Sequence, residues 1–328
     1  MRFKSLIFMI GLILFSLDNF TNVFAKNNNI YCYASCNDRK IYKIDARTGD
    51  ILSISKPFEE MGYPTCMDVS KDGKYLYIGS RMGQGQMDYY PLVIIDLQSM
   101  KMIKKFKYLD EEDRMKRKKY DEEKTKNPDP TKLFRKFVGI SAIYNLKVSP
   151  NSENIYLNYG NMKYIKKIVK FNIGSEKIIQ TIDIPFQDGY WSLSDDEKYL
   201  EILKKDRIVK YNLETSKKIS ENNTGELFFK KQGLNLTSKE IKAPLCYIPY
   251  KENKSKIICI NRSSGNKVWD KKIHIVSDSE YPTLSADGSI AVVTSDDLKI
   301  LLINLLEKKD IKLLKLDFET KCVLYPKY

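Results

Sequence analysis

Few residues of this 328-residue chain belong to the types that most often carry catalysis. His274 is the single histidine, and a lone histidine is more often a surface residue than a catalyst, so catalytic triads, histidine-based metal sites and histidine-ligated haem are disfavoured. No Cys-x-x-Cys-His segment offers covalent haem attachment, and Gly83 and Gly85 open no predicted helix that would form a phosphate loop. The sequence therefore predicts no cofactor and no metal, and it favours a non-catalytic protein.

Aromatic residues form the second chemically useful group, because several lie just ahead of predicted strands and two close a long predicted loop. Their rings can stack on a sugar, a cofactor or an inserted side chain, although Tyr and Trp also commonly fill the space between packed sheets. An arginine in the same loop adds a cation. The predicted ligand-binding residues are Tyr63, Arg81, Tyr89, Tyr90, Tyr144, Tyr190, Trp191 and Tyr281.

The elements that position these residues are repeats. A phrase made of an apolar residue, Asp or Asn, and a polar turn occurs six times, with the Asp or Asn at Asp45, Asp96, Asn172, Asn212, Asn261 and Asn304. A second phrase, clearest in Ser70-Lys71-Asp72-Gly73, precedes four of the six copies and supplies another tight turn between strands. One complete unit thus contains four strands, and units of this period predict an all-β fold of the β-propeller type.

One unit contains the segments V-S-K-D-G-K-Y-L-Y-I-G-S and V-I-I-D-L-Q-S between residues 69 and 99. These segments resemble the YVTN-type propeller repeats, a WD40-like family that is similar to the propeller subunits of bacterial quinoprotein amine dehydrogenases. The resemblance covers most of the mature chain, but only as a repeat pattern. It implies a propeller fold, and its motifs specify strands and turns rather than chemistry.

Counting strands predicts a six-bladed β-propeller. Only three strands, at residues 30–34, 41–45 and 51–55, precede the second blade, and one strand at residues 321–326 is left over after the sixth. The C-terminal strand is therefore predicted to complete the first blade, and this overlap of the two ends leaves no open sheet edge. Seven blades, as in the amine dehydrogenase subunits, are the alternative, which would require a blade within residues 109–142.

Residues 109–142 form a charged insertion between the second and third predicted blades. The run Leu109–Thr125 alternates acidic and basic clusters of good helix formers, which predicts a solvated helix with internal ion pairs, and Pro128 and Pro130 end it. In a propeller this insertion lies on the same face as the loop at residues 80–90. Irregular loops on a regular scaffold often carry function, so we expect a docking arm or lid, with a solvated flap as the alternative.

Residues 1–25 form a predicted signal peptide. Arg2 and Lys4 precede the apolar run Leu6–Leu17, and Val23-Phe24-Ala25 offers small residues for cleavage. The apolar run is too short for a comfortable membrane span, so we expect an exported protein, periplasmic or secreted, with residues 26–328 as one propeller domain. No stable membrane insertion is expected.

The net charge of +14 comes mostly from scattered lysines. A basic surface can attract nucleic acid or an anionic membrane. Here the lysines alternate with apolar residues, as at Lys40 and Lys43 and again at Lys167 and Lys170, which is typical of solvent-facing positions in a half-buried sheet. No nucleic-acid partner is expected.

The six cysteines of the mature region form an even set for an oxidising compartment. The propeller arrangement favours Cys246–Cys259 across a hairpin and Cys32–Cys322 at the closure, which leaves Cys36–Cys66. Buried free thiols are the rival interpretation.

Three functions follow in order of preference. The first is an exported, non-catalytic scaffold that binds a protein through the 109–142 insertion, or a small ligand, on the Tyr-rich face. The second is a quinoprotein amine dehydrogenase-like subunit that supports a catalytic partner, an interpretation that rests on fold alone. The third is a metal-dependent lactonase or esterase of the six-bladed type.

Overall fold

The computed structural model describes residues 30–81, 89–126, 142–160, 167–182, 190–194, 196–203, 207–223, 245–247, 256–260, 267–273, 283–285, 289–295, 298–315 and 320–325. The chain divides into two units, Met1–Ile30 and Tyr31–Tyr328, and the signal-peptide prediction for residues 1–25 lies outside the described residues. The described part of the second unit is mostly β-strand with one helix, α2 (Glu111–Lys126). Within these ranges no helix has the length and apolarity needed to cross a bilayer.

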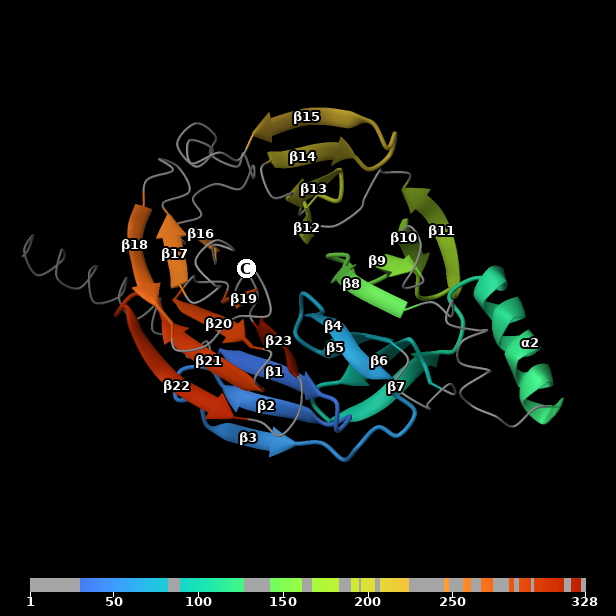
Figure 1. Cartoon of the computed structure of the whole chain (residues 1–328), viewed down its shortest axis with the longest axis horizontal. Helices are drawn as coiled ribbons and strands as arrows, with labels where there is room; N and C mark the ends of the chain where they lie inside the picture. Colours follow the sequence, from blue (N-terminus) through green and yellow to red (C-terminus); the bar gives the residue numbers. More distant parts are fainter. Residues whose placement is uncertain are drawn as a thin grey trace, which may run out of the picture. The chain divides into compact units, whose positions relative to one another are not determined.

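The described strands form six antiparallel sheets, five of four strands and one of three, in agreement with the predicted four-strand unit. Three sheets come from residues 31–182 and the C-terminal strand (Figure 1). They are β23 (Thr320–Tyr325) with β1 (Tyr31–Cys36), β2 (Ile41–Asp45) and β3 (Ile51–Ile54); β4 (Tyr63–Val69) to β5 (Tyr75–Arg81), β6 (Leu92–Asp96) and β7 (Lys101–Phe106); and β8 (Ala142–Val148) to β9 (Asn154–Gly160), β10 (Lys167–Asn172) and β11 (Lys177–Ile182).

The remaining three sheets follow in chain order. They are β12 (Tyr190–Leu193) to β13 (Tyr199–Leu203), β14 (Arg207–Asn212) and β15 (Lys218–Asn223); β16 (Leu245–Tyr247) to β17 (Lys256–Ile260) and β18 (Lys267–Lys272); and β19 (Thr283–Leu284) to β20 (Ile290–Thr294), β21 (Lys299–Asn304) and β22 (Lys309–Lys315). In each of the six sheets the strands pair with their chain neighbours, except that β23 pairs with β1, its partner far away in sequence.

The Asp or Asn of the first phrase builds the turn between the last two strands of a sheet. In five copies its Oδ1 atom accepts the backbone N–H three residues further on, at N–O distances from 2.6 to 3.1 Å. The residue after that donor has a positive φ of 53–74° in each of the five copies, namely at Gly49, Met100, Glu176, Ser216 and Lys308. The sixth copy, at Asn261, lies outside the described residues.

The same phrase also sets the register of its two strands. In each of the six sheets the pairing shifts by one residue at the apolar residue that begins the phrase, which is Ile44, Ile95, Phe171, Tyr211, Ile260 or Ile303. A type I turn followed by a left-handed residue and a bulge is a common way to close a hairpin. A repeated sequence phrase thus produces a repeated backbone geometry.

The second phrase builds the turn between the first two strands with a serine. In four sheets the serine Oγ accepts the backbone N–H five residues further on, at 2.9–3.0 Å; the pairs are Ser70 with Tyr75, Ser149 with Asn154, Ser194 with Tyr199 and Ser285 with Ile290. These serines are the ones that the sequence pattern singled out. Their hydroxyls close the turns without any need for a glycine at each one.

Neighbouring sheets pack through alternate residues of the same strand. In β5, Leu76 and Ile78 pack against Tyr33 and Ile41 of the β1–β3 sheet, whereas Tyr77 lies in the core shared with β8–β11. Similar apolar cores join the β8–β11 sheet to β12–β15, and β16–β18 to β19–β22. Middle strands such as β5 and β9 are therefore buried on both faces, as stacked sheets require.

The two edges of each sheet differ in their surroundings. We call β23, β4, β8, β12, β16 and β19 the inner strands, which Figure 1 shows toward the middle of the unit, and β3, β7, β11, β15, β18 and β22 the outer strands. The inner strands contact one another, as β4 does with β8 and with β23. The outer strands carry exposed apolar side chains at Ile51, Leu52, Ile54, Ile103, Ile179, Ile219 and Leu313.

A buried carboxylate fastens two inner strands together. Asp68 of β4 is 1% exposed, and its Oδ1 accepts the backbone N–H of Val69 at 3.0 Å. Its Oδ2 accepts the N–H of Val148 in β8 at 2.9 Å, so the charge is bonded to the backbone of the neighbouring sheet. A buried carboxylate without such donors would be strongly destabilising.

Two of the predicted disulfides are not formed in the structure. Cys32 and Cys66 carry free thiols. The register places Cys32 opposite Leu324 and Cys322 opposite Ala34, so Cys32 and Cys322 are diagonal neighbours. Diagonal positions lie about 7 Å apart, whereas bonded cysteines need Cβ atoms about 4 Å apart. The strands that carry Cys32 and Cys322 are adjacent, as the sequence predicted, but the two cysteines are offset by two residues in the register, and this offset explains why they are not bonded.

The third predicted pair has a suitable register. Cys246 of β16 lies directly opposite Cys259 of β17. Directly opposed positions bring Cβ atoms to about 4.5–5.5 Å, from which a small adjustment permits a bond. The Cys246–Cys259 disulfide stays a prediction.

Replacing Asp68 by alanine should destabilise the fold by about 3 kcal/mol, because two buried N–H groups lose their acceptor. Asp68→Asn keeps one oxygen acceptor in the same shape and should lose less. The measurement is urea unfolding followed by circular dichroism, with Asp121→Ala on the exposed side of α2 as the control. A loss for Asp68→Ala no larger than that of the control would contradict the inter-sheet role.

The residue of the first phrase that has a positive φ should be more stable as glycine than as any other residue. Gly49→Ala should lose about 1–2 kcal/mol, because φ is +74° and the added Cβ would lie 2.5 Å from Cδ of Lys312. Lys308→Gly relieves the same backbone conformation at φ 57° at an exposed side chain and should be neutral or stabilising by up to about 1 kcal/mol, since added freedom of the unfolded chain offsets part of the gain. Urea midpoints that move in the opposite directions would contradict this account.

Candidate binding surface at the loop end of the inner strands

The register of the β4–β7 sheet gives it two unlike ends. Tyr63 pairs with Arg81 and Leu92 pairs with Phe106, so these four residues lie at one end. The connections from β5 to β6 and from β7 to β8 leave from this end, which we call the loop end. The Ser70 turn and the Asp96 turn lie at the opposite end, which we call the turn end. The irregular parts of the repeat thus leave from one end of this sheet.

A β-bulge interrupts two neighbouring inner strands at equivalent positions. In β4 the pairing passes from Pro64 to Cys66, so Thr65 is the extra residue. In β8 it passes from Ile143 to Asn145, so Tyr144 is the extra residue. Each lies five residues before its turn serine. Bulges re-aim a side chain and are frequent beside functional sites.

The two bulges are bonded to each other across the sheets. The Thr65 hydroxyl donates to the carbonyl of Ile143, the residue before Tyr144, and also lies 3.1 Å from the carbonyl of Gly79. A Cβ added at Gly79 would lie 2.6 Å from both Cys66 Sγ and Ile143 Cγ2. Since only glycine fits there, β5 and β8 approach closely beneath the bulges.

Three of the predicted binding residues come together at this place. Tyr63 and Arg81 are cross-strand partners on β4 and β5, and Arg81 acts electrostatically on Tyr144 of β8. Burial raises the pKa of the Tyr144 phenol, and the nearby Arg81 cation opposes that rise. All three side chains are partly exposed. The Tyr144 hydroxyl is itself buried, so the surface offers the Tyr63 phenol, the Arg81 guanidinium and part of the Tyr144 ring, a combination that suits an anionic or planar ligand.

The other predicted residues divide into three groups. Tyr89 and Trp191 are fully buried, so their ring faces are packed in the protein interior, and Tyr89 lies against Gly62. Tyr90 is partly buried, with the Lys105 ammonium 4.6 Å from its ring centroid. Tyr190 is the first residue of β12, and Tyr281 lies outside the described residues.

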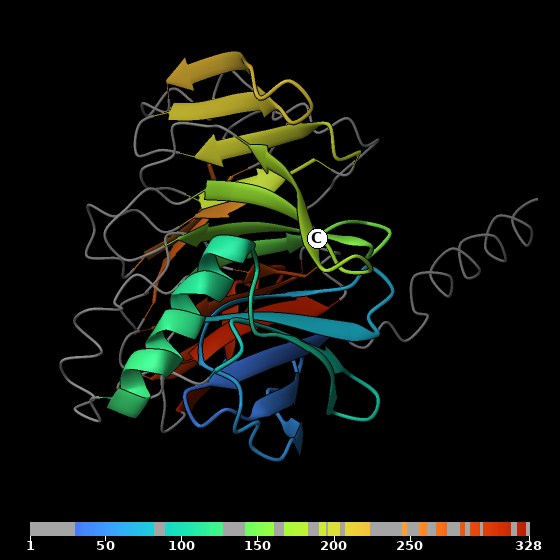
Figure 2. The same cartoon turned by 90° about the vertical axis from the view of Figure 1, so that its right-hand side faces the viewer.

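Helix α2 is the second irregular feature, and the sequence predicted it within residues 109–125. Figure 2 views the side of the unit that carries this helix. Leu109, just before it, is buried in the core shared by the β4–β7 and β8–β11 sheets, and Tyr159 of β9 donates to the carboxylate of Asp110. Tyr120 is buried, whereas Met115 is 58% exposed. The helix is thus anchored at its start and near Tyr120, with a largely exposed surface between.

Ion pairs within α2 match the predicted charge pattern. Arg114 bonds to Glu111 at 2.6 Å and Lys116 bonds to Glu112 at 2.7 Å. Both pairs are solvent-exposed, so water screens them and they add little to stability. They support the helix, and they leave its surface mixed in charge.

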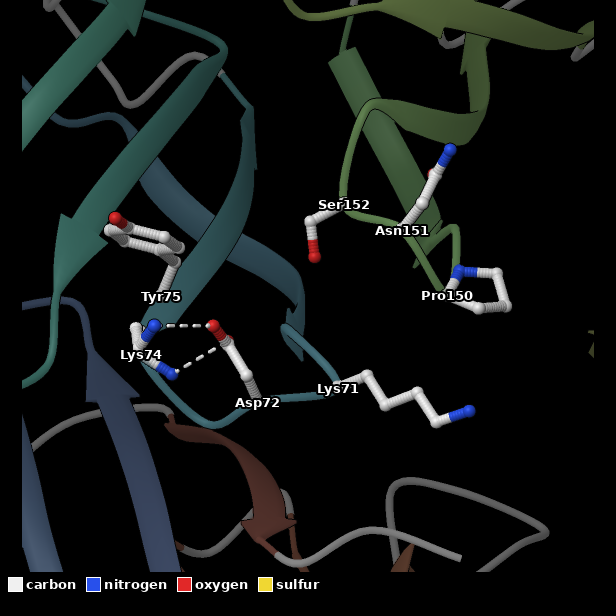
Figure 3. A pocket seen from close by; sticks show the side chains of 7 residues that line it. All are labelled: Lys71, Asp72, Lys74, Tyr75, Pro150, Asn151 and Ser152. Carbon is white, nitrogen blue, oxygen red and sulfur yellow. Dashed lines mark hydrogen bonds and ion pairs between the residues drawn. The ribbon is translucent and has the colours of Figure 1, made fainter.

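A groove of about 510 Å³ lies at the turn end, between the turns of two neighbouring sheets. Figure 3 shows Lys71, Asp72 and Lys74 on one wall, with Tyr75 behind them, and Pro150, Asn151 and Ser152 on the other. Its acceptors are already used to hold the turns. Asp72 accepts from Ser70, which lowers its pKa, and Asn151 accepts from Ser149 at 2.6 Å. We therefore regard the groove as a consequence of turn packing.

Metal ligation finds no support in the described ranges, where no group of three His, Cys, Asp or Glu side chains is placed to hold an ion. The sequence predicted Tyr63, Arg81 and Tyr144 as binding residues, which stays a prediction, but it did not reveal the bulges at Thr65 and Tyr144. Thr65 and Tyr144 each lie five residues before a turn serine, Ser70 or Ser149, and this equal spacing in the sequence indicated that the two positions are equivalent. Which residue is the extra one depends on how the two strands pair, and the local sequence does not show this pairing.

Two solved structures are similar to this chain. The chain is similar to the structure described as dihydro-heme d1 dehydrogenase NirN in complex with DHE, at 11% identity and a TM-score of 0.50, over 90% of this chain and 75% of that one. It is also similar to hydrazine synthase of Kuenenia stuttgartiensis, at 13% identity and a TM-score of 0.41, over 81% of this chain and 71% of that one. No protein-family model and no curated protein matches the sequence.

The likeness to NirN shows the fold and nothing of the activity, because the identity is so low. NirN is a β-propeller protein. Together with the repeated antiparallel sheets, the likeness makes this chain a β-propeller.

The Cys66 thiol should be unreactive in the folded protein. Burial raises its pKa from 9.0 to about 12, so iodoacetamide at pH 8 should label it at least 100-fold more slowly than in urea. Because the folded pKa is raised, the thiol's contribution to stability is full below pH 9 and is lost as the pH rises toward 12. Mass spectrometry of labelled peptides, with Cys66→Ser to assign the site, makes the measurement. Equal labelling rates in buffer and urea would show that the thiol is accessible.

Proposed function

We propose that this chain is an exported, non-catalytic β-propeller that serves as a binding scaffold. The proposed propeller has six blades and is closed by its C-terminal strand. The antiparallel pairing of β23 with β1 supports the closure, and the signal-peptide pattern in residues 1–25 supports export. The resemblance to YVTN-type repeats agrees with a role in which loops on a rigid scaffold make the contacts.

The observation that carries the proposal is α2, a helix of 16 residues placed on the outside of a regular scaffold. A helix that is almost wholly polar gains little from burial, so its ordering comes from the anchors at Leu109, Asp110 and Tyr120. The exposed surface between these anchors offers one apolar side chain, Met115, amid charges of both signs. An exposed apolar residue with a charged rim suits a protein partner.

The end of the β4–β7 sheet from which α2 departs also supports the insertion-bearing face as the proposed binding face. The connection that contains α2 leaves the β4–β7 sheet at the same end as Tyr63 and Arg81. A partner docked on α2 would have to extend over this end of the sheet to reach Tyr63 and Arg81 as well. In the dehydrogenase-subunit alternative this partner carries the cofactor, and in the lactonase alternative a metal at the channel replaces the partner.

The test compares capture of partners from native extract by the mature chain and by a variant with Met115→Ala, Lys118→Glu and Lys119→Glu. These side chains are exposed, so the variant should keep its unfolding midpoint while binding at least tenfold more weakly. The matched control places Lys71→Glu and Lys74→Glu at the turn end. A partner whose capture depends on α2 supports docking, and that partner's own cofactor would identify the dehydrogenase-subunit role.

Capture of the same proteins by the mature chain and the α2 variant would refute docking through α2. Saturable binding of Ca²⁺ to the isolated chain, measured by calorimetry, would favour the hydrolase alternative instead.

A further inference from the structure

Strand β3 presents an apolar surface at the outer edge of its sheet. It is the last strand of the sheet, after β2, and no other described strand pairs with its far side (Figure 1). The side chains of Ile51, Leu52 and Ile54 are 43, 51 and 52% exposed. A contiguous group of exposed apolar side chains typically marks a contact surface.

Charge distinguishes β3 from the other described outer strands. Each of β7, β11, β15, β18 and β22 contains at least one lysine, whereas β3 contains no charged residue. Charged side chains on an edge strand, lysine above all, prevent it from pairing with another chain. A register shift also protects an edge, but it recurs in all six described sheets and gives β3 nothing extra. Strand β3 is therefore the described outer strand least protected against association.

The backbone of β3 directs hydrogen-bonding groups toward this edge. The N–H of Ser55 donates to the carbonyl of Ile41 at 2.9 Å, so the backbone of Ser55 faces β2. The direction of the backbone groups alternates along an antiparallel strand, so the N–H and C=O of Ile54 point away from β2. An added strand would bind these groups.

Opposite charges flank the apolar residues. Asp50 precedes β3 and Lys56 follows it, and both side chains are exposed. Asp50 Oδ1 already accepts from Lys312 Nζ of β22 at 3.0 Å, which fixes the start of β3 against the neighbouring sheet, and the Asp50 side chain stays 65% exposed. A strand with an acid at one end and a base at the other is complementary to an antiparallel copy of itself.

We propose that β3 is the contact strand of a homodimer, in which two copies of this chain pair their β3 strands antiparallel about a two-fold axis at Ser53. This axis places Leu52 opposite Ile54 of the second copy and Asp50 opposite the second copy's Lys56. The half-exposed apolar side chains then cover one another, and the outward backbone groups find partners.

The dimer should be weak. A strand of four residues buries less than the roughly 1,000 Å² that a stable interface needs. Two chains that each carry a net charge of +14 also repel one another. The association is therefore expected to depend on protein concentration. This inference goes beyond the proposed function and does not depend on it.

The test is sedimentation velocity of the mature chain in 0.15 M NaCl, over a hundredfold range of concentration up to about 0.5 mM. The variant Leu52→Lys gives β3 the lysine that the other outer strands have and should raise the dimer dissociation constant at least tenfold. The matched control is Ile103→Lys, which adds the same charge on β7 at a side chain that is 54% exposed, and it should stay within twofold. Urea midpoints verify the fold of both variants.

A charge exchange tests the register. In the proposed pairing, Asp50→Lys alone sets cation against cation at both ends, and Lys56→Asp alone sets acid against acid, so each variant by itself should dimerise at least fivefold more weakly. A mixture of the two variants restores both attractive pairs and should contain heterodimers.

The proposal is overturned if the unmodified chain stays monomeric over the whole range, or if Leu52→Lys and Ile103→Lys weaken association equally. Single charge variants that dimerise as the unmodified chain does would overturn the register. A monomeric chain that captures an extract protein only while Leu52 is intact would assign β3 to a different partner and also overturn the homodimer.

The homodimer and the docking role of α2 can fail separately. The variant with Met115→Ala, Lys118→Glu and Lys119→Glu should self-associate as the unmodified chain does, because these residues lie on α2 and not on β3. Loss of partner capture with self-association retained supports both proposals. Self-association without any α2-dependent partner would support the homodimer and remove the docking role.

Discussion

In five of the six described sheets, the hydrogen bond from a turn N–H to the Asp or Asn of the first phrase determines the register. It holds the turn, places the next residue in the left-handed region and produces a bulge at the preceding apolar residue. Because side chains alternate faces along a strand, a one-residue slip would exchange the buried and exposed sets. The cores between sheets use both faces of middle strands, such as Leu76 and Tyr77 of β5, so they depend directly on this register. A weak local interaction, repeated in five of the described sheets, therefore controls a large apolar burial.

Packing between sheets adds a second constraint at the inner strands. Asp68 binds the backbone of β8, Thr65 binds the carbonyl before the bulge, and Gly79 admits the close approach of Ile143. These contacts are directional, unlike the apolar cores, and they fix how β4 lies along β8. The partly exposed side chains on the same strands, such as Tyr144 and Lys147, are consequently held on a rigid support. Rigid placement of a few polar groups is what selective ligand binding requires.

The sequence predicted much of the fold because the repeated phrases are local. Turn residues such as Asp96 and Ser70, the charged helix α2 and the pairing of the C-terminal strand with the first all follow from patterns within a few residues or from counting strands. Features set by pairing between distant strands could not be read in this way. Cys32 and Cys322 were assigned to adjacent strands correctly but are offset by two residues. Trp191 was expected at a surface and is buried, because an aromatic residue at a strand start has the same local pattern in either place.

The distribution of irregularity argues for function at the loop end of the β4–β7 sheet. The turn end is built by the same serine and Asp or Asn contacts in sheet after sheet, and a uniform structure offers little that distinguishes one site from the next. At the loop end, by contrast, a bulge re-aims Tyr144, Arg81 stands beside it, and the chain departs into α2. A bulge and an inserted helix each lie outside the pattern that stabilises the sheets, so folding alone does not require them. They lie at the adjoining loop ends of two neighbouring sheets, β4–β7 and β8–β11, and this is why we infer recognition of another molecule there.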